Sequence, residues 1–199
     1  MPRARAGSAF DSLSKEISIE TKRSLDRFEV RVFLCGAANK ANRAGRSRNR
    51  QKDIRTFLKS KLNSELKHCV VRLGEHKEMI RAFTEATGAR ASNLADHEFA
   101  LVKKHMDLVI IFPCSPGSYA ELGMFCLAKP VAEKMRIIIN RKYKNEKSYL
   151  MLGPVKAAEQ NNARIVFVNY RKRKDVWKEV KDLVLEVKAR KRKRRLLGD

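Results

Sequence analysis

The sequence predicts an α/β fold in which helices cover both faces of a mostly parallel sheet of about five strands. Short apolar segments rich in β-branched residues alternate with longer segments whose apolar residues have helical spacing. Such alternation favours parallel strands joined by right-handed helical crossovers. Residues 108–112 are apolar at every position, which is typical of a strand buried on both faces. We therefore expect this strand at the centre of the sheet.

The first half of the chain supplies two of these strands. Residues 9–27 have broadly helical apolar spacing and predict an N-terminal helix. Residues 29–35 are β-branched and apolar and predict the first strand, and residues 69–73 predict the second. Between them lie an arginine-rich loop and an amphipathic helix, which is indicated by Ile54, Phe57, Leu58 and Leu62. Residues 74–92 are expected to form a loop with a short helix.

The second half supplies the remaining three strands. They are expected at residues 108–112, 135–139 and 164–168. Helices are expected at residues 94–105, 118–127, 154–161 and 175–188. The pattern corresponds to a Rossmann- or flavodoxin-like three-layer sandwich, with an N-terminal helix and a basic C-terminal helix added. We divide the chain into a helical arm (1–28), a central domain (29–170) and a C-terminal helix with a basic tail (171–199).

Charge is the unusual feature of the composition. The chain has 45 Lys and Arg against 22 Asp and Glu, a formal net charge of +23, which favours a nucleic-acid partner. Residues 40–52 and 188–195 are strongly basic clusters without interleaved aromatics, so we expect salt-dependent, sequence-tolerant binding rather than base stacking. Deleting residues 188–199 is expected to flatten this salt dependence and to leave the ligand pocket intact. The candidate nucleic-acid contacts are Arg190, Lys191, Arg192, Lys193, Arg194 and Arg195.

Cysteine and histidine spacing argues against a metal centre. The four cysteines form no C-x-x-C pair, and the four histidines lack metal-ligand spacing. We expect reduced thiols in apolar surroundings, with neither a metal nor another cofactor. No apolar run approaches the ~20 residues of a membrane span, and the basic start is not followed by a signal-peptide core. The expectation is a cytoplasmic protein without a membrane partner.

Glu121 is the first candidate for a reactive group. Ser118 and Glu121 have the S-x-x-E spacing of a capping box, which requires no function. Alternatively, Glu121 is a reactive carboxylate at the strand ends, where Ser115, Gly117, Ser118 and free helix amides offer a seat for phosphate or ribose oxygens. The two interpretations are compatible, because a capped carboxylate is also a preorganised one.

A second carboxylate lies upstream. Glu98 falls on the apolar face of the helix at 94–105, which also carries Leu94, Leu101, Val102 and His105. An unpaired charge there would be costly, so either Glu98 reaches water or a basic partner, or it has a function. Asp96 lies about 200° around the helix, so the two acids cannot face one pocket. We favour a function for Glu98, because its helix leads directly into the central strand.

Several segments, in this order, resemble the nucleoside deoxyribosyltransferase superfamily, and within it the effector proteins of bacterial retrons. The resemblance covers roughly residues 29–169. The segments are VFLCG at 32–36, LGEH at 73–76, MDLVII at 106–111, SPGSYAELG at 115–123 and YLMLGPV at 149–155. The run at 115–123 is a fairly specific signal, whereas the one at 32–36 alone would be weak.

The resemblance implies roles for the matching positions. Glu121 would be the nucleophile and Glu98 the acid that handles the sugar, with Asp96 as its competitor. Ser115 and Ser118 would line the ribose or phosphate site. Gly36 would form the turn at the substrate's edge, with Arg43 and Arg46 as further phosphate contacts.

The implied function is cleavage of the N-glycosidic bond of a nucleotide, NAD or a related one, through a covalent glycosyl-enzyme. In a retron, such an enzyme would be an abortive-infection toxin controlled by a reverse transcriptase–msDNA complex. We expect a homo-oligomer or part of a larger complex. The alternatives are a housekeeping nucleoside deoxyribosyltransferase or nucleotide hydrolase, and a nucleic-acid-binding subunit on an inactive enzyme fold.

Overall fold

The computed structural model describes residues 19–21, 23, 27–36, 50–73 and 93–198. Residues 19–21 and 23 are helical, in agreement with the N-terminal helix predicted there. The rest of that helix lies outside the described residues. So do most of the arginine-rich loop and the segment 74–92.

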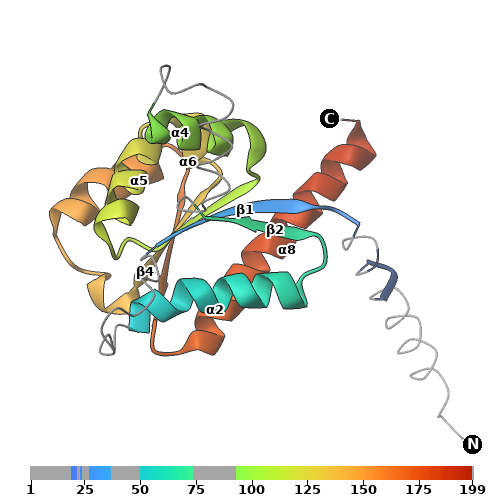
Figure 1. Cartoon of the computed structure of the whole chain (residues 1–199), viewed down its shortest axis with the longest axis horizontal. Coiled ribbons are helices and arrows are strands. Elements are labelled where there is room, and N and C mark those ends of the chain that lie inside the picture. Colours follow the sequence, from blue (N-terminus) through green and yellow to red (C-terminus); the bar gives the residue numbers. More distant parts are fainter. Residues whose placement is uncertain (1–18, 22, 24–26, 37–49, 74–92, 199) are drawn as a thin grey trace, which may run out of the picture.

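A five-stranded sheet forms the middle layer, and all four strand pairings are parallel. The strands are β1 (Val30–Cys35), β2 (Cys69–Arg72), β3 (Leu108–Ile111), β4 (Met135–Asn140) and β5 (Arg164–Val168). Their order in the sheet is β2-β1-β3-β4-β5, which is the flavodoxin-like order. β3 is central and at most 1% exposed at any residue, so the expected fold class and the central strand are confirmed (Figure 1).

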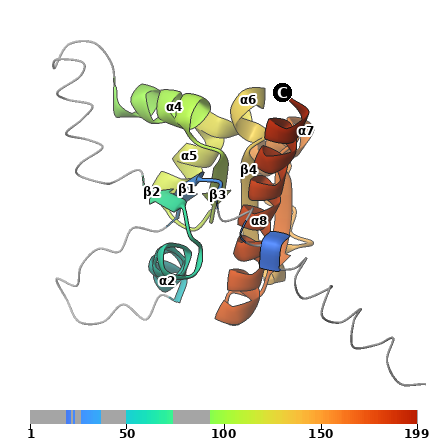
Figure 2. The same cartoon turned by 90° about the vertical axis from the view of Figure 1, so that its right-hand side faces the viewer.

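Helices cover both faces of this sheet. The elements outside the sheet are α2 (Arg50–Glu65), α4 (Leu94–His105), α5 (Pro116–Cys126), α6 (Lys129–Ala132), a 3-10 turn η2 (Arg141–Tyr143), a π-helical turn η3 (Met151–Val155), α7 (Lys156–Gln160) and α8 (Arg173–Leu197). α2 and α8 pack on one face, and α4, α5, α6 and α7 pack on the other (Figures 1 and 2). The three-layer arrangement follows.

Side chains of the buried strands alternate between these two helical layers. In β1, Val32 and Leu34 belong to the core beneath α2 and α8. Phe33 and Cys35 belong to the core beneath α4 and α5. The last residue of β1 therefore presents its side chain to α4 and α5.

The helices differ from the expectation in several places, and α8 extends well beyond the helix expected at 175–188. α5 begins at Pro116, two residues early, because the fixed φ of proline suits the first turn of a helix. The short helix α6 was not expected. The predicted helix at 154–161 is preceded by the π-helical turn η3 around Pro154, which has no N–H to donate to the preceding turn.

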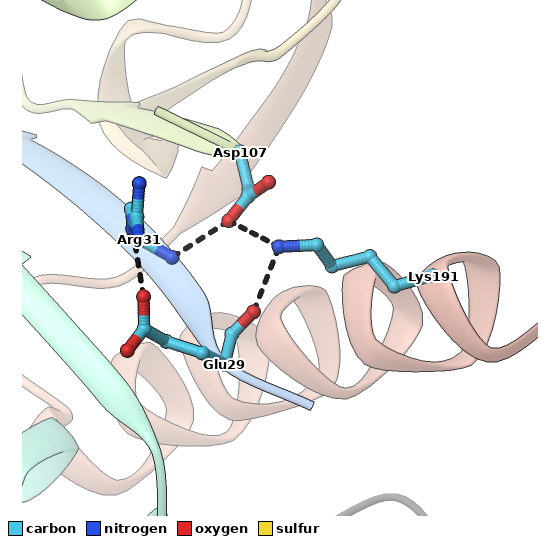
Figure 3. A network of polar contacts seen from close by, with 4 residues as sticks. All are labelled: Glu29, Arg31, Asp107 and Lys191. Atoms are coloured by element: carbon cyan, nitrogen blue, oxygen red, sulfur yellow. Dashed lines mark hydrogen bonds and ion pairs between the residues drawn. The ribbon is translucent and has the colours of Figure 1, made fainter. Parts of the chain in front are cut away.

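α8 continues through the basic segment and is fastened to the sheet by Lys191. The Lys191 ammonium donates to the Glu29 carbonyl oxygen at 2.8 Å and to Asp107 Oδ2 at 2.7 Å (Figure 3). The same Asp107 oxygen accepts the backbone N–H of Arg31 at 2.8 Å. We call these contacts the Lys191 clamp. Because Glu29 precedes β1 and Asp107 precedes β3, the clamp holds the amino ends of these two strands.

Lys188 makes a second attachment. Its side chain is 0% exposed, and its ammonium donates to the Lys67 carbonyl oxygen at 2.6 Å. Residues 188–197 therefore continue α8 and are attached to the rest of the fold. Their deletion would remove a buried cation and the Lys191 clamp together.

Candidate active site at the carboxyl ends of the strands

The candidate site lies where the order of the sheet reverses, between the carboxyl ends of β1 and β3. From β1 the chain crosses over to β2 on one side and later to β3 on the other. Sheets of this type bind ligands in the crevice at such a point. Here β1 ends at Cys35 and Gly36, and the loop after β3 leads into α5.

The start of α5 is fixed by a capping box other than the expected one. Ser115 is the N-cap, and Ser118 is the third helical residue. The Ser118 amide donates to Ser115 Oγ at 3.2 Å, and the Ser115 amide donates to Ser118 Oγ at 2.9 Å. Ser118 is 0% exposed, and its hydroxyl also donates to the Ser115 carbonyl oxygen. Ser118 is thus a structural cap, and Glu121 lies outside the capping box.

Glu121 lies in the second turn of α5 and is half-buried. Burial raises the pKa of its carboxyl to about 8, and the charge of Glu98 acts in the same direction. Interaction with the Cys35 thiol and the positive charge of Arg55 oppose this rise in pKa. Glu121 therefore lies among groups from three different elements.

Glu98 comes from α4 and is 9% exposed. Its Oε1 atom is buried, without a hydrogen-bond partner among the described residues, and burial raises the pKa of its carboxyl. Two neighbouring carboxyls with raised pKa values titrate as a pair, and the repulsion between two charges at this distance favours the form in which they share one proton. A buried pair of this kind supplies an acid and a base at one place.

The other acid of α4 lies elsewhere. Asp96 is exposed in the first turn, where its carboxylate accepts from the Asn93 side-chain amide at 2.8 Å. The apolar face predicted on α4 is buried at Glu98 and Val102 but exposed at its ends, Leu94 and His105. The structure brings Glu98, and not Asp96, to Glu121.

Two members of this cluster were not predicted as site residues. Arg55, on α2, is 5% exposed, and its Nη1 donates to the Gly36 carbonyl oxygen at 3.1 Å. Burial lowers the pKa of Arg55, whereas the charge of Glu121 raises it. Cys35 is 0% exposed, and its pKa is raised well above the usual value by burial and by the two acids, so it is a neutral thiol. We call Cys35, Arg55, Glu98 and Glu121 the carboxylate cluster.

A local signal for Arg55 was present in the sequence. It directly follows Ile54, the first residue of the apolar stripe of its helix, and therefore lies at the edge of the buried face. Gly36 lies against the side chain of Arg55, since a methyl group on Gly36 would be in ordinary van der Waals contact with Arg55 Cδ at 3.4 Å and with Phe112 Cβ at 3.5 Å.

The remaining candidate residues are dispersed. Arg43 and Arg46 lie outside the described residues, and Gly117 is exposed in the first turn of α5. Of the six basic residues near the end of α8, Lys191 forms the clamp and Arg192 is half-buried. The exposed ones are Arg190, Lys193, Arg194 and Arg195.

We searched the described part of the chain for a metal-binding cluster and for a helix that could span a membrane. Its His, Cys, Asp and Glu side chains form no group of three or more that could hold a metal ion. The four cysteines are free, and Cys35 and Cys126 are buried. None of the described helices combines the length and the apolar character that crossing a membrane requires.

Comparison with known proteins relates the chain to retrons. The family described as "STM3845 retron effector protein" matches residues 51–197. An Escherichia coli protein named "Retron Ec73 putative ribosyltransferase/DNA-binding protein" is 32% identical over 159 residues, which cover 80% of this chain and 46% of the relative. Its counterpart from retron Ec86, also from Escherichia coli, is 33% identical over 66 residues, which are 33% of this chain and 22% of that relative. The chain thus spans less than half the length of either relative.

Proposed function

The chain belongs to the STM3845 retron effector family, and from this premise we propose that it cleaves the N-glycosidic bond of a nucleotide, with Glu121 as nucleophile. The observation that carries the proposal is the buried carboxyl pair at the reversal point of the sheet. A ribosyltransferase, as the two relatives are named, also breaks a bond to the anomeric carbon of ribose. NAD or a related nucleotide is the substrate class that we propose.

The proposed reaction has two steps. In the first, a Glu121 oxygen bonds to the anomeric carbon while the bond from that carbon to the base nitrogen breaks. Glu98 donates the shared proton to the leaving base where the base needs one. For a base that leaves without a proton, such as nicotinamide, Glu98 releases its proton to the solvent instead. In the second step, water attacks the anomeric carbon, the deprotonated Glu98 takes the proton of the water, and the Glu121–sugar bond breaks.

The neighbours of the two acids support this division of roles. The Arg55 guanidinium and the Cys35 thiol both favour the charged form of Glu121. The interaction between the two acids acts in the opposite direction, since it raises the pKa of Glu121 and lowers that of Glu98, and it places the shared proton on Glu121 in the free protein. The proposed mechanism therefore requires the proton to move to Glu98, whose buried Oε1 has no hydrogen-bond partner among the described residues, when the substrate binds. Positive charge that develops at the anomeric carbon would further favour a charged Glu121.

In the cell, we propose that this activity is the toxic output of a retron. Control by a reverse transcriptase–msDNA complex would keep the nucleotide pool intact until the retron is triggered. The charge of +23 is compatible with such a nucleic-acid partner. We further propose that the protein acts as a homo-oligomer or as part of a larger complex.

The test is to incubate the purified protein with NAD, nucleotides and nucleosides and to separate the products by chromatography. Glu121→Gln keeps the shape of the side chain and removes its charge, so cleavage should fall by orders of magnitude without a loss of thermal stability. Glu133→Gln, at an exposed position after α6, is the matched control and should retain activity.

The products separate the alternatives. Transfer of the sugar to a second base, with slow hydrolysis, would indicate a housekeeping transferase. Equal activity of the parent and Glu121→Gln on every substrate would contradict the enzyme hypothesis. The alternative, a nucleic-acid-binding subunit on an inactive enzyme fold, would then be favoured.

The exposed basic residues of α8 favour DNA binding as a second function, which both relatives also carry in their names. Replacing Arg190, Lys193, Arg194 and Arg195 by Gln spares Lys188 and the Lys191 clamp. Affinity for duplex DNA should fall, and the slope of log affinity against log salt should flatten by about 0.9 for each phosphate that the variant no longer neutralises. A slope equal to that of the parent would show that these residues do not bind DNA.

A further inference from the structure

All four tyrosines of the chain line one pocket, which lies beyond the carboxyl ends of β3, β4 and β5. The pocket has a volume of about 870 Å³ and includes Tyr119, Tyr143, Tyr149 and Tyr170 in its wall. Neither Glu98 nor Glu121 lines it. We call it the tyrosine pocket. The proposed cleavage chemistry leaves it without a role.

Tyr149 has one face of its ring exposed to solvent. Tyr149 is 87% exposed, and its ring lies across Gly153. A methyl group on Gly153 would lie 3.6 Å from both Cε2 and Cζ of that ring and 3.8 Å from Cε1. Three such similar distances place the ring face, rather than its edge, against the glycine. The opposite face of Tyr149 is therefore available to a flat ligand.

The other rings form the floor and the flanks of the pocket. Tyr170 is buried, donates its hydroxyl to the Ile138 carbonyl oxygen, and meets the Phe112 ring edge-on with centroids 5.8 Å apart. Tyr119 is 46% exposed at the start of α5. Tyr119 and Tyr149 thus both expose aromatic surface in the wall of one pocket, where their rings can contact a ligand.

A cationic groove adjoins the tyrosine pocket. It shares Asn140 with the pocket and has a volume of about 670 Å³. Two acids, Asp175 and Glu179, line it against five cations, which are Arg141, Lys142, Arg171, Lys172 and Lys178. Lys142 connects the two hollows, because its ammonium lies 4.3 Å from the centre of the Tyr143 ring.

The segment between the tyrosine pocket and the cationic groove has cationic residues interleaved with aromatic ones. Residues 141–149 read RKYKNEKSY. Proteins that hold single strands combine a cationic path for the backbone with aromatic rings for the bases. The basic clusters at 40–52 and 188–195 lack the aromatic half of this combination.

We propose that the tyrosine pocket and the cationic groove together bind single-stranded nucleic acid. A base stacks on Tyr149 and Tyr119, and the adjoining phosphates lie along the groove near Lys142. Bases in a duplex are already paired and stacked, so the pocket selects single strands. This site is separate from the proposed cleavage site, since the carboxylate cluster lies on the other side of α5.

The test is fluorescence anisotropy with labelled oligothymidylate of about 12 nucleotides, and with a duplex of the same length. Tyr149→Ala should weaken single-strand binding by roughly fivefold to a hundredfold, the range for loss of one stacked base. Tyr149→Phe keeps the ring and should bind like the parent. Leu152→Ala changes a residue that is 66% exposed in the π-helical turn η3, just after Tyr149, and outside the pocket wall; it is the matched control and should also bind like the parent.

A second pair of variants tests the groove. Lys142→Met removes a cation and should lower the salt slope for oligothymidylate by about 0.7, the value for one phosphate of a single strand. Lys104→Met is its control, because Lys104 is exposed in the last turn of α4, which leads to the amino end of β3. Its slope should equal that of the parent.

Three outcomes would overturn the proposal. The first is single-strand binding by Tyr149→Ala that equals binding by the parent. The second is an equal loss for duplex and single strand. The third is unchanged oligothymidylate binding with a raised KM for nucleotide cleavage, which would make the pocket the base site of the substrate. Because binding is measured without turnover, failure of the cleavage proposal would leave this result interpretable.

Discussion

The two sides of α5 differ in what they enclose. On one side, Glu121 meets Glu98, Cys35 and Arg55 in a place largely closed to water. On the other, Tyr119 and Gly123 face an open pocket with exposed aromatic rings. A buried acid pair has shifted pKa values and suits bond cleavage, whereas exposed rings suit reversible stacking. One helix can therefore serve two sites, because residues two apart point about 200° away from each other.

The largest effect is expected on the carboxylate side. If Glu98 holds and returns the shared proton, Glu98→Gln should lower kcat for nucleotide cleavage by roughly a hundredfold or more. Asp96→Asn changes an exposed acid of the same helix and should reduce kcat far less. Steady-state kinetics of both variants decide this, and equal losses would show that burial beside Glu121 is not what matters.

The next effect is a pH dependence of stability. Glu121 has a pKa of about 8 in the folded chain against an ordinary value of 4.5. The folded state thus binds more protons than the unfolded state between these pH values. The free energy of unfolding should fall as pH rises through this window, by on the order of a few kcal/mol, and should change little from this source above it.

Denaturant unfolding of the parent and of Glu121→Gln, each at pH 5 and pH 8.5, measures this dependence. Glu121→Gln should lose most of the fall and should be more stable than the parent at the higher pH. Glu133→Gln removes the same charge at an exposed position and should follow the parent. Parallel curves for the parent and Glu121→Gln would mean that Glu121 titrates normally.

The smallest effect concerns the tyrosine side. Gly123 lies inside α5, and a methyl group there would meet nothing within 4 Å. Gly123→Ala should therefore raise the free energy of unfolding by about 0.5–1 kcal/mol, as alanine does in a helix interior. The added methyl group would enter the wall of the pocket and should weaken oligothymidylate binding. Unchanged binding would show that the stacked base does not approach α5 at this point.

The fold could be predicted because its signals are local. The apolar run of β3 and the helical spacing of α4 fixed both elements within one residue. α6 has four residues, too few for a periodic pattern, and the π-helical turn η3 depends on how one proline is accommodated. Such features arise from packing rather than from pattern.

The candidate site was predictable only where a motif marked it. Glu121 and Glu98 were found from a motif and a helical face. Arg55 was missed because its local signal, a place beside the apolar stripe of α2, does not stand out in a chain with 45 basic residues until its burial is known. The tyrosine pocket assembles rings from residues 119 to 170, and no local pattern joins them.

The Lys191 clamp has a consequence for the order of events during synthesis. Its hydrogen bond to Glu29 joins residues 162 positions apart in the chain, so this contact forms on the ribosome only after α8 has emerged, later than the pairing of β1 with β2 and β3 can form. We expect nascent chains arrested shortly before residue 191 has left the ribosome to be cut near Glu29 by a protease, and chains arrested beyond it to resist. Equal cleavage of both would contradict this order. For a protein proposed to be toxic, late formation of the Lys191 clamp would delay activity until residue 191 has been translated and has left the ribosome.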